Sequence, residues 1–375
     1  MYVSELYGKL KVVRRHGTVS DYATGLLNFN PTGNFPGSGE QGVTGIAVDP
    51  ASGDVFASKV YEDTASSSDP KPHYAKVVRF HSDDGEKTAA SQTTILDMHG
   101  EPQGYSHQIS NLTVGPDGLL CVHNGDGFNP AIAQNLGSFG GKVLRMSLGG
   151  NAAPDNPFYD TSDGISARDY VFASGFRNPF GGAWRSQDGA HYVVENGPST
   201  DRFAQVVAAR DFGWDGSNAT MSNFALYNWS PPHAPVNIAF VEPQTSVGSF
   251  PSDKMGHAFV TESGPTWASG PQELGKRIVE LAPRGGRSFT GTKPEEVVEY
   301  TGRARQPPPA WQRGGRALLH RPLQGRGLHV PERSRREPAA GEMDWRPHSA
   351  RSERVDSCGG LPRYRQHANS VGDSR

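Results

Sequence analysis

Apolar and polar residues alternate along short segments of the chain, and one strand pattern returns at long intervals. Each copy is an apolar strand that begins with a basic residue and runs into a polar or glycine-rich turn. The copies begin at Lys9, Lys76, Lys142 and Lys276, so the spacings are 67, 66 and 134 residues. Because 134 is twice 67, we expect one skipped or degenerate copy near Arg210.

A second repeated element has two short strands around a tight turn. It occurs over residues 45–58, 112–124 and 182–196. Strand-turn-strand units that recur at a fixed long period indicate a radial or stacked β architecture. Helical periodicity is nearly absent, and we expect at most one short helical turn, over residues 294–300. The pattern therefore predicts an all-β protein, a β-propeller, with long loops inserted between its strands.

Composition agrees with many tight turns. The chain has 46 Gly and 29 Pro among 375 residues, and both residue types favour turn conformations. No stretch reaches the roughly 18 apolar residues of a membrane span, so we expect none. The two cysteines predict no disulfide framework, and Cys121 is expected in the core. Four further residues are expected to be blade-packing aromatics: Trp184, His191, Tyr192 and Trp214.

The chain ends have a different character. Met1 falls inside the first repeat, which suggests an incomplete first blade. Residues 301–375 contain 15 Arg but no Lys, Ile or Phe. A shift of reading frame in GC-rich DNA explains this composition best, and a natural disordered tail is the alternative. A nucleic-acid-binding arm is disfavoured because the segment lacks Lys and helical periodicity. We therefore expect a propeller over residues 1–302 and an Arg/Pro-rich tail over 303–375.

Three loops carry candidate chemistry. His107 stands just before a predicted strand, and an imidazole can accept a proton near neutral pH. Arg177 and Asn178 precede a proline in a second loop. In a third loop, Gly197 and Pro198 offer backbone carbonyls, which are oxygen donors of the kind that calcium takes. Each has a simpler structural explanation, as a hydrogen-bonded surface histidine, a tie between strands, and a turn.

These segments, GFRNPFG, ENGPSTD and SHQISNLTVGPDG, resemble the glucose/sorbosone dehydrogenase family, soluble sugar dehydrogenases that use pyrroloquinoline quinone (PQQ) and calcium. The resemblance spans about residues 1–306 and implies a six-bladed propeller, here incomplete at both ends. It implies that His107 is the general base and that Arg177 and Asn178 lie against PQQ. It also implies that the carbonyls of Gly197 and Pro198 ligate the Ca²⁺ that polarises the quinone.

The resemblance adds weaker candidates for cofactor binding, and at two places this chain differs from the family. An early loop offers Gln41, or else Glu40, to the cofactor, and Arg303 with Arg305 resembles a pair that grips its carboxylates. Ser106 stands where glucose-oxidising members have an aspartate that would orient the histidine ring and stabilise the imidazolium, so its absence puts glucose specificity and rate in doubt. Relatives also have acidic residues where this chain has Arg202 and Phe203, so any structural calcium that needs those acids is expected to be missing.

The function that the resemblance implies is oxidation of a sugar hydroxyl or lactol carbon by hydride transfer to PQQ. Electrons would pass to an external acceptor, a dye, quinone or cytochrome, and the family suggests a periplasmic or secreted protein. Two alternatives remain. One is a non-catalytic propeller that binds a glycan or protein partner. The other is a calcium-dependent lactonase-type hydrolase, which would need several acidic or amide side chains around the metal.

Overall fold

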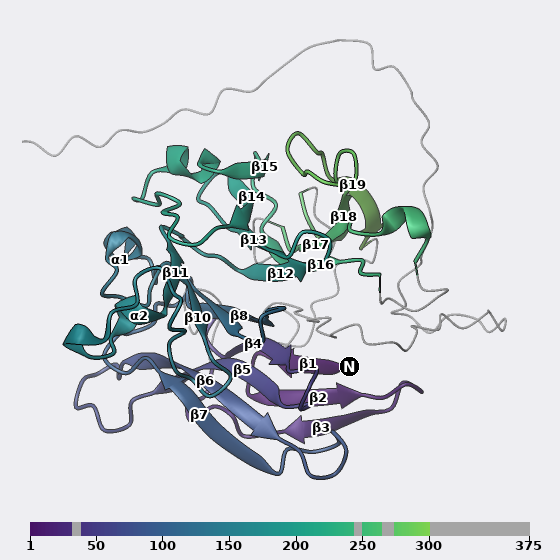
Figure 1. The fold of residues 1–375 in the computed structure, drawn as a ribbon. Helices are drawn as coiled ribbons and strands as arrows, with labels where there is room; N and C mark the ends of the chain where they lie inside the picture. Colours follow the sequence, from purple (N-terminus) through teal and green to yellow (C-terminus); the bar gives the residue numbers. More distant parts are fainter. Residues whose placement is uncertain (32–38, 244–249, 265–273, 301–375) are drawn as a thin grey trace, which may run out of the picture. The chain divides into compact units, whose positions relative to one another are not determined.

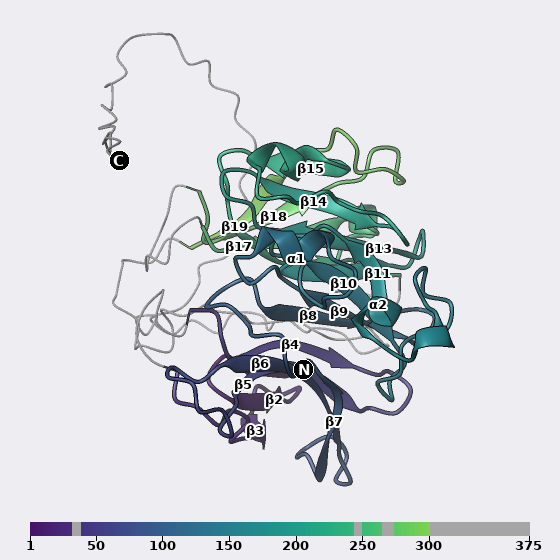
Figure 2. The same ribbon diagram turned by 90° about the vertical axis from the view of Figure 1, so that its left-hand side faces the viewer.

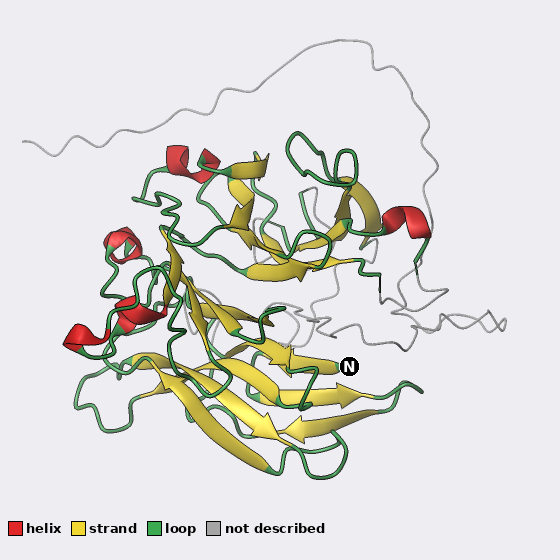
Figure 3. Ribbon diagram, viewed as in Figure 1, coloured by secondary structure: helices red, strands yellow, loops and turns green. Residues whose placement is uncertain are grey.

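The computed structural model describes residues 1–31, 39–243, 250–264 and 274–300, and these are built almost entirely from β-strands (Figures 1 and 3). Consecutive strands pair antiparallel into five sheets. The strands of the first two sheets are β1 (Tyr2–Glu5), β2 (Lys9–Val13) and β3 (Val19–Ala23), then β4 (Val43–Val48), β5 (Val55–Glu62), β6 (His73–His81) and β7 (Ser91–Asp97).

The other three sheets also follow the chain order. They consist of β8 (Ile109–Val114), β9 (Leu120–Asn124), β10 (Lys142–Met146) and β11 (Val171–Ser174); then β12 (Gly181–Arg185), β13 (Ala190–Glu195), β14 (Asp201–Val206) and β15 (Ala225–Trp229); and lastly β16 (Pro235–Phe240), β17 (Ala258–Glu262), β18 (Arg277–Leu281) and β19 (Glu295–Glu299). The described helices are two short segments, α1 (Pro130–Gln134) and α2 (Ala167–Tyr170), and three 3₁₀ turns at Thr161–Asp163, Asn218–Ser222 and Ser252–Lys254.

The first strands of neighbouring sheets are in contact, β1 with β4, β4 with β8, β8 with β12 and β12 with β16 (Figure 1). Figure 2 shows β4 and β8 from the side. Each contact between successive sheets is filled by a separate apolar cluster. Phe80 belongs to the cluster of the first two sheets, and Phe56 to that of the second and third. Phe176 lies between the third and fourth sheets, and Phe289 between the fourth and fifth. Four-stranded meanders packed face to face in chain order form a β-propeller, so we call the sheets blades 1 to 5.

The expected number of blades is wrong for the part of the chain that the structure describes. Five blades are present there instead of six, and blade 1 has three strands whereas the others have four. The repeat supplies only about four and a half periods before residue 301, and the later residues carry no such repeat. The expected tail, residues 303–375, lies outside the described residues, so its frameshift origin stays a prediction.

The structure locates the missing copy of the lysine repeat. Lys76 lies near the start of β6 and Lys142 begins β10, both third strands of their blades. The third strand of blade 4 is β14, where the matching basic residue is Arg202. In blade 5, Lys276 precedes β18 directly, and Arg277 is that strand's first residue. The copy was expected near Arg210 and lies at Arg202 instead, because an arginine replaces the lysine and the spacing is uneven, 60 residues after Lys142 and 74 before Lys276.

The strand-turn-strand elements are confirmed as the first two strands of blades 2, 3 and 4. Cys121 is confirmed as a buried core residue with a free thiol. The helical turn expected over residues 294–300 is wrong, because Glu295–Glu299 forms β19 and pairs with β18. Pairing with a buried strand overrides the local preference of a short acidic segment.

Candidate functional site at one end of the blades

Four segments next to the strands of blades 3 and 4, before β8 and after β9, β11 and β13, meet at one end of the strands, and backbone hydrogen bonds join them in series. The amide of Gly127 donates to the carbonyl of His107 over 2.9 Å, and the amide of Asp126 donates to that of Arg177 over 2.8 Å. The amide of Asn196 then donates to the carbonyl of Asn178 over 3.0 Å. The loop with Arg177 therefore contacts the loop with Gly197 directly and is joined to the His107 segment through Asp126 and Gly127, although His107 and Gly197 lie 90 residues apart in the chain.

His107 is buried and held from several sides. Its backbone is in the left-handed region, φ 57°, which is uncommon for a residue with a side chain. The backbone amide donates to Glu40 Oε2 over 3.1 Å. Gly125 passes so close that a Cβ atom there would lie 2.4 Å from the His107 carbonyl group. Backbone strain of this kind concentrates at functional sites, where the surrounding structure enforces it.

The imidazole of His107 is oriented by Asp126, which sequence reasoning missed. His107 Nδ1 lies 2.6 Å from Asp126 Oδ1, and both side chains are buried. A carboxylate accepts hydrogen bonds, so Nδ1 carries the proton and Nε2 is left with its lone pair in the neutral ring. Nε2 makes no hydrogen bond to another residue within the described part of the chain. Such a ring is prepared to accept a proton at Nε2.

Asp126 supplies the orienting carboxylate that Ser106 cannot. The acid that orients the ring comes from the end of β9 instead of the position before the histidine. A carboxylate directly after a buried strand, between Gly125 and Gly127, was the available signal in the sequence. Trp214 Nε1 donates to Asp126 Oδ2 over 2.7 Å, and the ring packs as expected in a buried apolar cluster, although its partners there are Ala133 and Met221 of the loops and not blade strands. Trp184, His191 and Tyr192 do lie in the blade packing, as expected.

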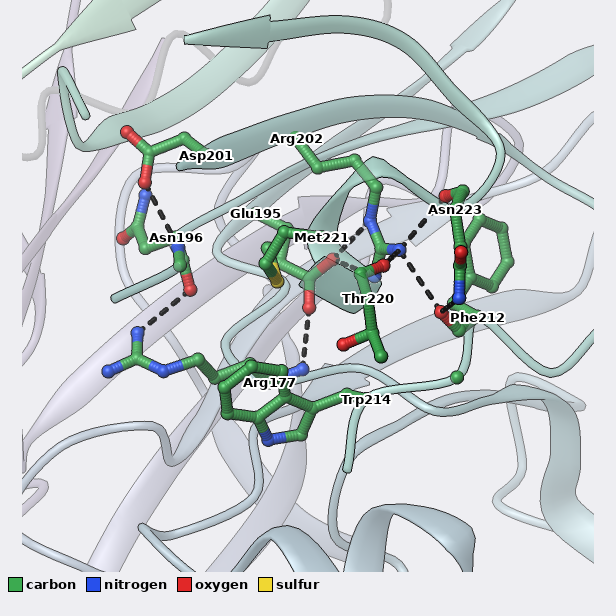
Figure 4. A network of polar contacts seen from close by, with 12 residues as sticks. Arg177, Glu195, Asn196, Asp201, Arg202, Phe212, Trp214, Thr220, Met221 and Asn223 are labelled. Carbon is green, nitrogen blue, oxygen red and sulfur yellow. Dashed lines mark hydrogen bonds and ion pairs between the residues drawn. The ribbon is translucent and has the colours of Figure 1, made fainter. Parts of the chain in front are cut away.

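Arg177 adjoins the segment that holds Asp126, because its carbonyl accepts the Asp126 amide, and Figure 4 shows its side chain beside Asn196 and Trp214. Arg177 Nη1 donates to the carbonyl of Asn196 over 2.9 Å, and the guanidinium lies over the Trp214 ring with its carbon 5.7 Å from the centroid. Burial lowers the pKa of Arg177, although the nearby Asp126 and Glu195 oppose this effect. Asn178 is buried, and its Oδ1 has no hydrogen-bond partner in the described part of the protein. A buried amide oxygen without a partner is a position to which a bound ligand can donate a hydrogen bond.

The loop after β13 presents two backbone carbonyls. No described residue donates a hydrogen bond to the carbonyl oxygen of Gly197 or of Pro198. The carboxylate of Asp201 is turned inward, where it accepts from the amides of Gly197, His233 and Ala234. Burial raises the pKa of Asp201 to about 6, against the effect of these amides. The unused oxygens are hard donors that suit Ca²⁺, with the remaining ligands to come from a cofactor or water.

Arg202 is fully buried beneath this loop (Figure 4). Its guanidinium pairs with Glu195 at 2.5 Å and donates to the backbone carbonyls of Phe212, Thr220 and Asn223. The other oxygen of Glu195 accepts the backbone amide of Arg177 over 2.5 Å. Four oxygen acceptors thus converge on one cation, and the ion pair connects the loop 195–201 with Arg177.

The early loop supports the histidine segment. Gln41 Nε2 donates to the carbonyl of Gly104 over 2.9 Å, and its oxygen accepts from His73 Nδ1. Glu40 bonds to the backbone of His107 as described above. The side chain of Gln41 is therefore engaged by the protein next to the candidate base. Arg303 and Arg305 lie outside the described residues.

Among the residues that the structure describes, no three His, Cys, Asp or Glu side chains cluster as a metal site. A calcium site formed by backbone carbonyls and a cofactor needs no such cluster of side chains. The described segments also contain no helix with the length and apolar character required to cross a membrane.

The five described blades define the chain as a β-propeller protein, and comparison with known proteins shows its family. Residues 1–233 match the model of the Glucose / Sorbosone dehydrogenase family, and the chain belongs to this family. It is 26% identical over 199 residues to quinoprotein glucose dehydrogenase B of Acinetobacter calcoaceticus, which covers 47% of this chain and 40% of that protein.

Further proteins similar to this chain are also described as sugar or glucose dehydrogenases. The aldose sugar dehydrogenase YliI of Escherichia coli K12 is 29% identical over 134 residues, 36% of this chain and 35% of that protein. The structure of a putative oxidoreductase (glucose dehydrogenase) of Thermus thermophilus superposes with a TM-score of 0.58 and 26% identity, covering 80% of both chains. The PQQ-bound aldose sugar dehydrogenase of Streptomyces coelicolor gives 0.57 and 24%, covering 79% and 77%. The matches with the curated relatives span less than half of those proteins.

Proposed function

We propose that this protein is a PQQ-dependent sugar dehydrogenase in which His107 is the general base. The observation that carries the proposal is the His107–Asp126 pair, which leaves Nε2 as the proton-accepting atom, while Trp214 contacts both Asp126 and Arg177. Membership in a family whose named relatives include a quinoprotein glucose dehydrogenase supports the cofactor. The substrate class is an aldose or a related sugar with an oxidisable hydroxyl or lactol carbon.

In this proposal the residues have separate tasks. His107 Nε2 takes the proton from the hydroxyl oxygen of the sugar, and Asp126 stabilises the imidazolium that results. Arg177 supplies a fixed positive charge for the carboxylates and oxygens of the cofactor, a task for which a planar guanidinium is suited. Asn178 offers its unpaired Oδ1 as a hydrogen-bond acceptor to an N–H group of the cofactor. Gln41 supports the segment that carries His107.

When bound, PQQ would accept the hydride from the sugar carbon, and Ca²⁺ on the carbonyls of Gly197 and Pro198 would polarise its quinone. The donor set fits the ion because both oxygens lack partners among the described residues. Reduced cofactor would pass electrons to an external quinone or cytochrome, and we place the protein in the periplasm or outside the cell.

The test is reconstitution of the full chain with PQQ and Ca²⁺, followed by reduction of an artificial dye with a panel of aldoses and sugar alcohols. We expect PQQ-dependent turnover, and His107→Ala should reduce kcat by roughly 10²–10⁴-fold while PQQ still binds. Equal loss of PQQ binding and turnover would make His107 a cofactor-pocket residue.

Absence of turnover with every sugar, despite a folded protein, would contradict the proposal. Sugar binding without PQQ affinity would favour a non-catalytic propeller that binds glycans. Hydrolysis of a lactone in the presence of calcium alone would instead favour the hydrolase, although the described residues offer backbone carbonyls instead of convergent acidic side chains at the candidate metal site.

A further inference from the structure

A second histidine has the same place in its blade as the candidate base. His233 stands two residues before β16, the first strand of blade 5, just as His107 stands two residues before β8, the first strand of blade 3. The beginning of each first strand pairs with the end of the second strand in its blade. Both histidines therefore lie at the end of the blades where the candidate site lies.

The side chain of His233 also has the same partners. Its Nδ1 lies 2.8 Å from Oε2 of Glu262, the last residue of β17, whose side chain is completely buried. The other oxygen of Glu262 accepts from Trp229 Nε1 over 2.7 Å. In blade 3, Asp126 likewise holds a histidine Nδ1 with one oxygen and Trp214 Nε1 with the other. A histidine–carboxylate–tryptophan triad thus occurs in both blades.

The free nitrogen of His233 is an acceptor that water can reach. Because Nδ1 donates to the carboxylate, the neutral ring has its lone pair on Nε2. Nε2 makes no hydrogen bond to another residue in the described segments, and 19% of the side chain is exposed, against 6% for His107. The charged groups around the ring are Glu262 and Arg277, whose Nε lies 3.1 Å from the same Oε2. His233 is therefore arranged to accept a proton and to release it to solvent.

The loop that carries His233 is bonded to the candidate calcium loop. Asp201 Oδ2 accepts the backbone amide of His233 over 2.8 Å, and its Oδ1 accepts that of Gly197 over 3.0 Å. Asn196 Nδ2 donates to the carbonyl of Pro235 over 2.8 Å. The triad of blade 5 therefore adjoins the loop that presents the unused carbonyls.

We propose that His233 is a second proton-accepting residue of the site and acts when electrons leave the bound cofactor. Oxidation of a sugar hydroxyl carbon removes two electrons and two protons. His107 takes the proton of the hydroxyl, whereas the carbon-bound hydrogen leaves as hydride, which is a proton with both electrons. When the electrons pass to the external acceptor, this proton remains, and His233 Nε2 takes it and releases it to water. The inference rests on the proposed function and adds a residue to its second stage.

The experiment measures this second stage by itself. The full chain loaded with PQQ and Ca²⁺ is reduced with dithionite in the absence of oxygen and then mixed with a water-soluble quinone. We expect His233→Ala to slow reoxidation by roughly 10²-fold, with PQQ affinity within about twofold, and added imidazole to restore part of the rate. His257→Ala is the matched control, because His257 pairs through Nδ1 with the carboxylate of Glu280 at the opposite end of blade 5. It should leave the rate unchanged.

Two further measurements do not depend on that variant. His233→Gln cannot accept a proton and should lose the rate as well. In the cofactor-free chain, nitrogen NMR should find the proton of the neutral His233 ring on Nδ1, as the bond to Glu262 requires. An unchanged rate in both variants would overturn the inference, and so would a proton on Nε2 or an equal loss in His257→Ala.

Failure of the proposed function gives a different result. Because dithionite replaces the sugar as reductant, absence of sugar oxidation contradicts the proposed function without altering the effect of His233 on reoxidation. Normal sugar oxidation with a reoxidation rate that is insensitive to His233 overturns this inference alone. An unmodified chain that binds no PQQ contradicts both.

Discussion

Glu195 and Arg202 form an ion pair in which both side chains are completely buried, with Arg202 Nη2 2.5 Å from Glu195 Oε2. The two residues face each other in the register between β13 and β14, at the end of the strands where the site lies. The equivalent pair in blade 5 is Glu262 with Arg277, which lie 3.1 Å apart. In blade 4 this pair supports the loop with the unused carbonyls on one side and the backbone of Arg177 on the other.

Removing the cation of this pair should destabilise the protein. Arg202→Met leaves the carboxylate of Glu195 buried without a partner, and we expect the free energy of unfolding to fall by about 3–5 kcal/mol. Denaturant unfolding measures the change. The double variant Glu195→Gln with Arg202→Met should recover part of the loss, because it removes both buried charges. Lys11→Met, which breaks a solvent-exposed pair with Asp21, is the control and should change stability little.

Asp126 should affect turnover without affecting ligand binding. Asp126→Asn keeps the size of the side chain but presents an amide that can donate to His107 Nδ1, which favours the wrong tautomer. We expect kcat to fall by up to roughly 10²-fold, less than in His107→Ala, because the base is still present. The KM for sugar and the affinity for PQQ should stay within about twofold. Asp155→Asn, an exposed aspartate paired with Arg145, is the matched control. A parallel loss of PQQ binding would contradict a positioning role.

A histidine pair between blades 3 and 4 should make the protein sensitive to acid. His123 Nδ1 donates to the carbonyl of Pro179, so its Nε2 accepts from His191 Nε2 over 2.8 Å, and His191 Nδ1 has no partner in the described structure. Burial lowers the pKa of His123 to about 4 and that of His191 well below its usual range. Between about pH 6.5 and 4 the two histidines are protonated in the unfolded chain but stay neutral in the folded protein. The free energy of unfolding therefore falls as the pH falls.

From His123 alone, the loss over that interval is about 3 kcal/mol. Unfolding curves at a series of pH values measure it. His191→Gln removes one titrating group and keeps an amide donor for His123, so the loss on acidification should be smaller. His16→Asn alters an exposed histidine and should leave the pH dependence unchanged. An identical pH dependence in His191→Gln would show that the pair does not cause the sensitivity.

Removal of calcium should weaken PQQ binding and leave the fold intact. The candidate ligands from the protein are two backbone carbonyls, whereas Arg202 already connects the surrounding strands and loops. We therefore expect a chelator to raise the Kd for PQQ at least tenfold, as the loss of about 1.4 kcal/mol would do, without lowering the Tm of the cofactor-free chain. Gly197→Ala should mimic the chelator, because a Cβ there would lie 1.9 Å from the carbonyl oxygen of Thr200. PQQ binding that is insensitive to chelation would exclude the proposed calcium site.

The sequence by itself determined the local features of this protein. The return of one local strand pattern at long intervals predicts a propeller. Alternating apolar residues and tight turns predict strands, because these patterns involve residues close together in the chain. The segments with His107, Arg177 and Gly197 were recognisable for the same reason. The sequence did not reveal the arginine that replaces the repeated lysine, nor that Glu295–Glu299 joins a sheet.

Only the tertiary structure decided how the site is assembled. The partner of His107 is 19 residues away, and the tryptophan that bonds to that partner is 88 residues beyond it. Phe128 and Arg202 likewise have neighbours that come from other loops and strands. Such contacts depend on how blades 3 and 4 pack and on where their loops meet. No local pattern of apolar and polar residues shows which residues far apart in the chain will come into contact.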